Sequence, residues 1–350
     1  MDYMFIIRGG IVKKVYIVLF MLIFCTFAIP IIFTKNTVSG KIANDTNETT
    51  ENTTEEIQMI DYNYKQYDTI KLLHADTGEI EELPLDTYLL GVVSAEMPAN
   101  FEQEALNAQA LVARTYTIYS IVHSGGKHGE ADICDDSGCC QAWISKEDRM
   151  ARWDEAQRED NWRKIEIAVN TTAGKIITYN GEVIDAFFHS NSGGTTEAPV
   201  NVWGGTNYPY LQSVETAGED AYSQYSSEVV LTKEEFQNKI LAKHSDFTID
   251  YSQTDCIQIL EYTESGRIKT IKIGNLNLSG VEVRTLLGLR SANFEVSLDG
   301  DNIKFSVKGY GHGVGMSQTG ANTLAKEGKN YKDIINHFYA NVEIKDVNSI

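Results

Sequence analysis

The segment from residue 101 to 124 predicts a helix of about six turns with apolar side chains on nearly every side. Asn100 opens this helix, with Gln103 in the reciprocal capping position, and Gly125-Gly126 ends it. Its apolar positions are Ala105, Leu106, Ala108, Ala110, Val112, Ala113, Ile118, Ile121 and Val122. A helix that is apolar all round is buried. The rest of the fold must therefore be built around it.

Signals for both helices and strands lie on either side of this helix. Asn180-Gly181 predicts a type I′ turn inside a hairpin, and Thr232 with Glu235 forms a capping box that opens another helix. The predicted strands are residues 68–73, the hairpin at 175–188 and mixed strands over 246–310; the predicted helices are 83–95, 147–169, 232–243 and 281–289, with a Gly-rich loop entering a helix over 310–328. We expect an α+β fold of two lobes, one built around the central buried helix and one from the later strands, with a cleft between them.

Two polar side chains, Gln109 and Arg114, interrupt the middle of the buried helix. A buried arginine needs a carboxylate or carbonyl partner, because an unpaired charge is costly away from water. Arg114 could form a structural ion pair, or it could contact a substrate directly. The residues alone leave both interpretations open.

The N-terminal residues differ in kind from the rest of the chain. The run from Val15 to Phe33 carries no charge, and as a helix it would reach about 28 Å, close to the hydrocarbon thickness of a bilayer. A cleaved signal peptide is the alternative, although Ala28-Ile-Pro30 fits its cleavage site poorly. The basic residues before the run predict the organisation: cytoplasmic residues 1–14, a transmembrane anchor at 15–33, a polar linker at 34–62 and an extracytoplasmic folded region at 63–350.

The part of the chain beyond the predicted anchor is strongly acidic. Removing residues 1–35 takes away four basic residues and one acid, which leaves 26 basic and 48 acidic residues and a net charge of −22. Such a surface repels phosphate backbones and anionic lipids. The composition therefore argues against nucleic acid as a partner and permits a neutral or basic one.

One carboxylate, Glu96, stands between small apolar residues and Met97-Pro98. Apolar neighbours disfavour the ionised form and raise the pKa of a carboxyl, which is what a general acid near neutral pH requires. The alternative is a structural role, in which Glu96 caps the next helix or pairs with Arg114. Pro98 disfavours helical backbone at Met97 and so predicts that Glu96 lies at a helix end.

Two Gly-rich segments further along combine histidine with small polar residues. The first follows the predicted hairpin and the second enters the last predicted helix. Glycines let a ligand approach the backbone closely, and a helix N-terminus suits a polar ligand. Each segment could instead be an ordinary turn or a tight connection with a packed histidine. The candidate residues are His189, Ser190, Ser192, Gly193, Tyr310, His312 and Gln318.

Three of the five cysteines cluster beside a histidine. His128, Cys134, Cys139 and Cys140 lie within 13 residues, and three thiols with one imidazole can complete a tetrahedral, structural zinc site. The rival is a disulfide from Cys134 to Cys139 or Cys140, which suits a location outside the cytoplasm and leaves one thiol unpaired. The spacing leaves both open. Cys256, by contrast, has the pattern of a small buried hydrophobic residue.

Several separate stretches follow one another in an order typical of one family. They are LDTYLLGVVSAEMPANF with EALNAQALVARTYT, then FFHSNSGGTTE with VWGG and YPYL, then GYGHGVGMSQTGAN. Together they resemble the stage II sporulation protein D (SpoIID) family, of the clostridial type, over residues 65–345. The apolar run and the polar linker before them also fit this family.

The resemblance implies a lytic transglycosylase that cleaves the MurNAc–GlcNAc bond of peptidoglycan strands already stripped of stem peptides, called denuded strands. It identifies Glu96, in the family's AEMP motif, as the catalytic acid of a catalytic region over 63–350. It implies action in forespore engulfment from the mother-cell engulfing membrane, with a SpoIIP-like amidase and a SpoIIM-like membrane protein as partners. Related members hold a structural zinc with two cysteines and two histidines, so Cys139 is an additional thiol here.

A single carboxylate suits this chemistry. Glycoside hydrolases usually need two, and beside Glu96 only Asp185 and Glu197 come into question, by their proximity to His189. In a lytic transglycosylase the substrate's own C6 hydroxyl attacks the anomeric carbon. We therefore expect Glu96 to act alone, without a cofactor, in a sugar groove that Arg114 helps to hold. The alternatives are a glycan hydrolase and a non-enzymatic, glycan-binding stimulator of a wall amidase. The other expected groove residues are His189, Ser190, Ser192, Gly193, Tyr310, His312 and Gln318.

Overall fold

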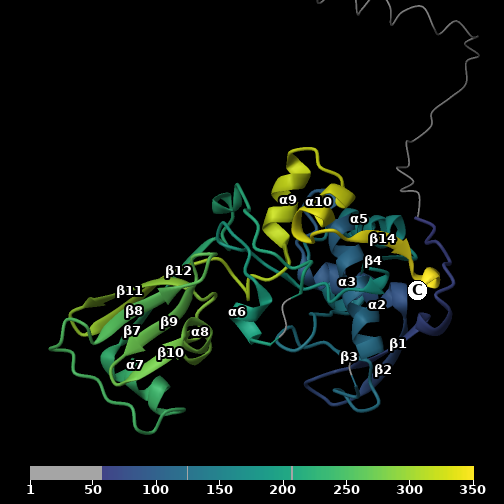
Figure 1. The fold of residues 1–350 in the computed structure, drawn as a ribbon. Helices are drawn as coiled ribbons and strands as arrows, with labels where there is room; N and C mark the ends of the chain where they lie inside the picture. Colours follow the sequence, from purple (N-terminus) through teal and green to yellow (C-terminus); the bar gives the residue numbers. More distant parts are fainter. Residues whose placement is uncertain (1–56, 124, 206–207) are drawn as a thin grey trace, which may run out of the picture. The chain divides into compact units, whose positions relative to one another are not determined.

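The computed structural model describes residues 57–123, 125–205 and 208–350, which fall within one compact unit. Its helices and mixed sheets confirm the predicted α+β fold (Figure 1). Among these residues, no helix combines the length and the hydrophobicity that crossing a membrane requires. The predictions for residues 1–14 and 15–33, and for most of the linker at 34–62, lie outside the described residues.

Helix α3 (Gln103–His123) lies in the larger hydrophobic core, as its sequence predicts. Its side chains are almost all buried from Ala105 to Ile118, whereas Val122 is 50% exposed. The elements that pack against it include helices α2 (Leu85–Glu96), α5 (Arg158–Thr171), α9 (Gln318–Lys326) and α10 (Tyr331–Phe338), and strand β4 (Lys175–Tyr179). The helix emerges from the core only near its C-terminal end, which the all-round apolar pattern does not predict.

Two three-stranded sheets accompany the helices of this core, in the orders β2-β1-β3 and β14-β4-β5. Asn180 and Gly181 have φ of 52° and 87°, as the predicted type I′ turn between β4 and β5 requires. The strands are β1 (Thr69–Leu73), β2 (Ile80–Pro84), β3 (Ile133–Cys134), β4 (Lys175–Tyr179), β5 (Glu182–Val183) and β14 (Glu343–Asp346). The helices are α2 (Leu85–Glu96), α4 (Lys146–Arg152), α5 (Arg158–Thr171), α6 (Pro199–Trp203), α9 (Gln318–Lys326) and α10 (Tyr331–Phe338), with short 3₁₀ turns at Lys65–Tyr67, Glu219–Ala221 and Val347–Ser349.

The single helix predicted over 147–169 is divided into α4 and α5. Trp153 has extended backbone after α4, with φ of −91° and ψ of 151°. Its ring centroid lies 6.5 Å from that of Trp162 on α5. A contact between aromatic side chains thus accompanies a break that the helical pattern of the sequence does not show.

The later strands build a smaller hydrophobic core. Two antiparallel sheets, β11-β12-β7 and β10-β9-β8, are joined there by helices α7 and α8 (Figure 1). Thr232 and Glu235 make both bonds of the predicted capping box at the start of α7. The elements are β7 (Ser226–Thr232), α7 (Lys233–Leu241), β8 (Ile257–Tyr262), β9 (Ile268–Ile273), β10 (Leu276–Ser279), α8 (Gly280–Leu287), β11 (Asn293–Asp299) and β12 (Asn302–Lys308). Both cores belong to one compact unit, so the division into two lobes remains a prediction.

A short parallel strand pair joins the two Gly-rich segments of the sequence. Strand β6 (Phe188–His189) pairs with β13 (Met316–Ser317), and Ser317 lies opposite His189. Gly315 permits this approach, because its φ is 71° and a Cβ there would lie 2.0 Å from the carbonyl oxygen of Phe187. Segments far apart in the sequence are thereby placed side by side.

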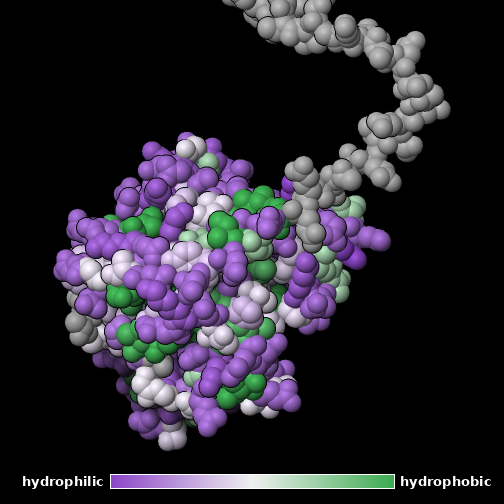
Figure 2. Space-filling model, turned by 90° about the vertical axis from the view of Figure 1, so that its right-hand side faces the viewer, coloured by the Kyte–Doolittle hydropathy of each residue, from purple (hydrophilic) through white to green (hydrophobic). Residues whose placement is uncertain are grey.

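One face of the molecular surface shows how polar and apolar side chains are distributed. The face drawn in Figure 2 is mostly hydrophilic, with small hydrophobic patches separated by polar side chains. The large apolar side chains are concentrated instead in the two hydrophobic cores. On this face the molecule shows no extended apolar surface of the kind that a membrane or an obligate partner would cover.

Candidate active site

A large cavity brings together the two Gly-rich segments and the end of α2. Its volume is about 1110 Å³, somewhat above the usual range for ligand pockets, which suits an extended ligand. Glu96 lines it with five of the residues predicted to bind substrate, namely His189, Ser190, Tyr310, His312 and Gln318.

Glu96 is the last residue of α2, and its carboxylate accepts two hydrogen bonds. The Ala142 backbone N–H donates to Oε1 at 2.7 Å, and the Gln318 side-chain amide donates to Oε2 at 3.1 Å. Burial raises the pKa of Glu96, and these two hydrogen bonds act against the rise. A carboxyl with a raised pKa keeps its proton closer to neutral pH, so Glu96 has the property that a general acid needs.

The loop that carries Ala142 is held against α2 and α3. The neighbouring Gln141 is fully buried, and its side-chain amide donates to the hydroxyls of Tyr88 and Thr117, each at 2.9 Å. This anchoring fixes the position from which the Ala142 N–H reaches Glu96. No motif in the sequence reveals the contact, because a backbone donor carries no residue signature.

His189 is buried as a neutral imidazole at the wall of the cavity. Its Nδ1 lies 3.0 Å from the carbonyl oxygen of Val314, so this nitrogen carries the hydrogen. Its Nε2 is buried and has no hydrogen-bond partner among the described residues. Burial lowers the pKa of His189 to about 3, and Arg267 acts in the same direction. Neutral His189 cannot serve as a general acid near neutral pH, and its Nε2 lies beneath the surface of the cavity.

His312 belongs to an aromatic cluster on the same wall. Its ring centroid lies 5.7 Å from that of His189 and 5.1 Å from that of Trp203. Trp203 is 51% exposed and Tyr310 is 44% exposed, and both line the cavity. Exposed aromatic rings with a polar handle suit a ligand such as a sugar, which has both apolar faces and hydroxyls.

Arg114 does not reach the cavity. Its guanidinium is fully buried and donates to the carbonyl oxygens of Thr172 and Val169, at 2.7 and 3.1 Å. It also lies 3.3 Å from a carboxylate oxygen of Asp86. This geometry matches the structural ion pair that the sequence left open, and it places Arg114 in the core of the fold instead of in the wall of a groove.

Ser192 and Gly193 also lie outside the lining of the cavity. The Ser192 side chain is fully buried, and its hydroxyl bonds to Glu219. A Cβ at Gly193 would lie 3.1 Å from the backbone nitrogen of Gly309. The small size of both residues serves the close packing of the chain behind the cavity wall.

A buried carboxylate, Glu219, holds the two Gly-rich segments together. Its two oxygens accept from the backbone N–H groups of Ser192 and Gly194 and from the hydroxyls of Ser192, Thr216, Ser317 and Thr319. Ser317 and Thr319 flank Gln318, which donates to Glu96. Glu219 therefore fixes the segment from which Gln318 reaches the candidate acid.

Several cavity residues carry little signal in the sequence. They are Tyr116 and Tyr119 on α3, Asp185, Trp203, Tyr208 and Arg284 on α8. Tyr116 and Tyr119 lie in a predominantly apolar helix, and Arg284 lies in a short helix without an unusual pattern. Only the tertiary structure therefore assigns these residues to the cavity. Three of these residues lie in stretches that carry the family resemblance: Tyr116 in EALNAQALVARTYT, Trp203 in VWGG and Tyr208 in YPYL.

The two acids considered near His189 differ in their surroundings. Asp185 lines the cavity, and burial raises the pKa of its carboxyl to about 7, with Lys127 acting against the rise. Glu197 lies outside this cavity and accepts from the hydroxyls of Thr263 and Ser265, at 2.6 and 2.7 Å. Of these two acids, only Asp185 lines the cavity together with Glu96.

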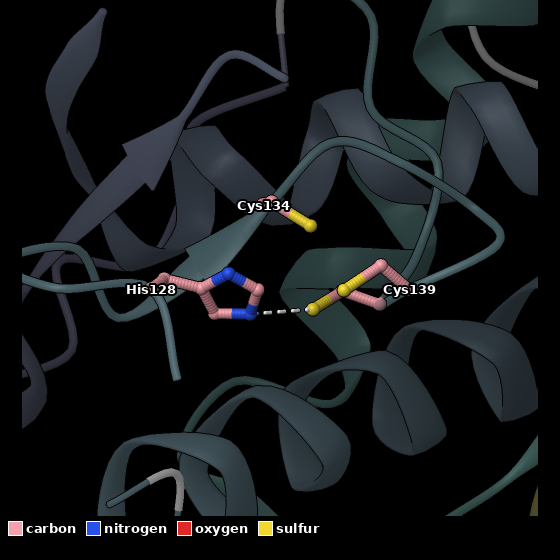
Figure 3. A group of neighbouring side chains, drawn as sticks. His128, Cys134 and Cys139 are labelled. Atoms are coloured by element: carbon pink, nitrogen blue, oxygen red, sulfur yellow. Dashed lines mark hydrogen bonds between the residues drawn. The ribbon is translucent and has the colours of Figure 1, made fainter. Parts of the chain in front are cut away.

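The four residues predicted to bind a metal converge. One ligand atom from each of His128, Cys134, Cys139 and Cys140 lies within 4.8 Å of the others. Figure 3 shows His128, Cys134 and Cys139 pointing toward one another, and Cys140 Sγ lies 3.2 Å from His128 Nε2. All three cysteines are free thiols. Three thiolates and an imidazole match the donor types and the coordination number of a structural zinc site.

Comparisons with known proteins agree with the family that the motifs suggest. The family model of the stage II sporulation protein SpoIID matches residues 74–179. Stage II sporulation protein D of Bacillus subtilis (strain 168) is 37% identical over 282 residues, which cover 80% of each chain. That of Bacillus amyloliquefaciens is 36% identical over 285 residues, again 80% of each chain. The amidase enhancer of Bacillus subtilis (strain 168) is 28% identical over 302 residues, covering 72% of this chain and 39% of the enhancer.

The matched range of the family model includes Glu96 and all four candidate metal ligands. The similarity to the two sporulation proteins extends over most of each chain at more than a third identity. This chain therefore belongs to the SpoIID family of stage II sporulation proteins.

Proposed function

We propose that this protein is a lytic transglycosylase that cleaves the MurNAc–GlcNAc bond of denuded peptidoglycan strands in forespore engulfment. The observation that carries the proposal is Glu96, a carboxyl with a raised pKa at the wall of a cavity large enough for an extended glycan. Membership of a sporulation family supports a role in remodelling the cell wall during sporulation.

One carboxyl group is enough to balance this reaction. Protonated Glu96 gives its proton to the glycosidic oxygen as the bond from that oxygen to the anomeric carbon of MurNAc breaks. The C6 hydroxyl of the same MurNAc attacks this carbon, and ionised Glu96 takes the hydroxyl proton. The product has a 1,6-anhydro end, and no water is consumed. The hydrogen bonds from Ala142 and Gln318 stabilise Glu96 while it is ionised.

Asp185 shares the cavity but does not fit the second carboxylate of a hydrolase. Such an enzyme needs an ionised nucleophile or base beside its acid, and the two pKa values are pushed apart. Here burial raises the pKa of both Glu96 and Asp185, the latter to about 7. At neutral pH Asp185 is therefore ionised only in part, which favours the mechanism that uses a single acid.

The products of cleavage test the proposal. Purified protein, incubated alone with denuded strands, should release fragments with 1,6-anhydro ends, detected by mass spectrometry. Reducing ends would show a hydrolase instead. The similarity to an amidase enhancer favours a second function, in which the cavity binds glycan and the protein stimulates a wall amidase. Release of no fragments, together with faster cleavage by an added amidase, would support that second function.

The substrate also suggests the partners and the location. Stem peptides must be removed before denuded strands exist, so we propose that a SpoIIP-like amidase acts first and that a SpoIIM-like membrane protein holds the complex. The apolar run at 15–33 would anchor the chain, as a single span, in the engulfing membrane of the mother cell, with residues 63–350 outside the cytoplasm. The net charge of −22 supports a partner other than nucleic acid.

We propose that His128, Cys134, Cys139 and Cys140 hold a structural Zn²⁺. All four positions would be taken by protein, so the ion would offer no open position to a substrate and would supply no chemistry to the cleavage. Its effect would be on structure, because Cys140 lies two residues before Ala142, whose N–H donates to Glu96.

Removing this metal should destabilise the protein. Atomic absorption should find about one zinc per chain, and a strong chelator should lower the midpoint of thermal unfolding by several degrees, because a structural zinc contributes directly to the free energy of folding. A reductant without chelator is the control, and it should leave the midpoint unchanged. Sensitivity to the reductant combined with indifference to the chelator would instead indicate a disulfide at Cys134.

A further inference from the structure

Arg284 presents an unpaired guanidinium to the cavity that contains Glu96. It lies on α8, where Val283 and Leu287 are buried in the smaller core, and its own side chain is half-buried and lines the cavity. Among the described residues no carboxylate pairs with it. Burial lowers the pKa of Arg284, and only Tyr310 acts against this shift.

Two fully buried arginines show what Arg284 lacks. Arg114 has carbonyl oxygens and a carboxylate around it. Arg267 donates to the carbonyl oxygens of Thr195 and Ser192, at 2.8 and 2.7 Å. Acceptors of this kind offset the cost of taking a charge out of water. Arg284 bears part of that cost until a ligand supplies the acceptor.

The nearest candidate partner, Glu197, lines a smaller pocket with Arg284, but its carboxylate accepts hydrogen bonds from Thr263 and Ser265 and makes no ion pair with the guanidinium. His189 and His312 line the same wall as neutral imidazoles, because burial holds the pKa of each below its usual range. Burial lowers the pKa of Arg267, Glu197 and Glu219 act against this shift, and the nearby charge of Arg284 adds to it. The hydrogen-bond donors of Arg284 are therefore left for an acceptor that a ligand brings into the cavity, and a guanidinium binds an anionic acceptor most strongly.

Denuded strands carry one kind of ionised group, the lactyl carboxylate of MurNAc. A stem peptide converts this group to a neutral amide, and GlcNAc has no counterpart. We propose that Arg284 binds the free lactyl carboxylate of a MurNAc residue and so selects peptide-stripped over peptide-bearing strands. The inference rests on the proposed function. A planar guanidinium matches a carboxylate in bidentate geometry, so the recognised group and the recognising group fit each other.

The selectivity follows from the unpaired state of Arg284. A free carboxylate gives the guanidinium charge-assisted hydrogen bonds and offsets its desolvation. An amide offers only a neutral acceptor, and the charge stays uncompensated. Sites that leave a buried polar group unpaired with the wrong ligand discriminate strongly.

The test compares two forms of one glycan: denuded strands, and the same strands with their lactyl carboxylates converted to methylamides. For the wild type we expect kcat/KM to be roughly 10- to 100-fold higher on the carboxylate form. In Arg284→Gln, kcat/KM on the carboxylate form should fall by this factor, whereas kcat/KM on the methylamide form should equal that of the wild type. Arg284→Lys keeps the charge without the planar fork and should retain part of the preference.

Arg152→Gln is the matched control, because Arg152 is exposed and lies outside the cavity lining. It should leave both values of kcat/KM at the wild-type level. If Arg284→Gln fails to fold, the role of Arg284 is still tested by the preference of the wild type for the carboxylate form and by the reduction of that preference in Arg284→Lys. Equal wild-type rates on the two glycans, or an equal loss on both in Arg284→Gln, overturn the role of Arg284 and leave the proposed function standing. If the wild type cleaves neither glycan, the proposed function fails, and binding affinities for the same two glycans test Arg284.

Discussion

Replacing Glu96 by glutamine should abolish glycan cleavage while leaving the fold and glycan binding intact. A positioned general acid contributes about 10²- to 10⁴-fold to a rate. Because Glu96 would both give and take a proton, we expect a loss at the upper end of this range or beyond it. Release of 1,6-anhydro ends from denuded strands measures the rate, and sedimentation of the protein with the strands measures binding.

Asp185→Asn is the comparison that separates the mechanisms. A hydrolase with two carboxylates would lose as much from this change as from Glu96→Gln, whereas we expect a much smaller loss. The wild-type rate should also fall as the pH rises through the raised pKa of Glu96, since only the protonated carboxyl can act as the acid. Near-wild-type cleavage by a folded Glu96→Gln protein would refute the assignment.

Glu219→Gln replaces one carboxylate oxygen by an NH₂ group of similar size. We expect it to be among the most destabilising isosteric substitutions in the described part of the chain. Glu219 is buried, and each of its oxygens accepts from several donors. In either orientation a glutamine turns an NH₂ group toward donors that need an acceptor. We expect the free energy of unfolding to fall by ~3 kcal/mol or more, since several buried donors lose a charged partner. Denaturant-induced unfolding measures the change.

Asp220→Asn provides the matched control for this prediction. Asp220 follows Glu219 in the same 3₁₀ turn, and its side chain is exposed, so loss of its charge should leave stability almost unchanged. Glu219→Gln should also slow cleavage, because Ser317 and Thr319 would no longer fix Gln318 beside Glu96. An unfolding curve equal to that of Asp220→Asn would contradict the role of Glu219.

Local patterns predicted local structure well. The capping box at Thr232, the turn at Asn180-Gly181 and the central position of α3 all follow from spacing within a short stretch. The end of α2 at Glu96 is explained by Pro98, since Met97 has extended backbone. The four candidate metal ligands could also be predicted as a group, because they are near neighbours in the chain.

Long-range pairing was beyond the same reasoning. The sequence shows that Arg114 needs a partner but not that Asp86 provides it. A small hydroxyl residue such as Ser192 suggests a sugar site, but in the structure its hydroxyl donates a hydrogen bond to the buried carboxylate of Glu219. The residues around Arg284 in the sequence do not mark it as a binding residue, and only its position in the cavity lining suggests that role. These features depend on which segments meet, and periodicity carries no information about that.

Glu96 takes one of its two hydrogen bonds from Gln318, which comes 222 positions later in the chain. If the chain crosses the membrane in sequence order from its predicted anchor, α2 emerges long before α9. Contacts of such large sequence separation form late in folding. Under the proposed function, a partly exported chain would have Glu96 outside the membrane before Gln318 could donate its hydrogen bond. The order of export would then delay glycan cleavage until nearly the whole protein has crossed the membrane, and no separate inhibitor would be needed.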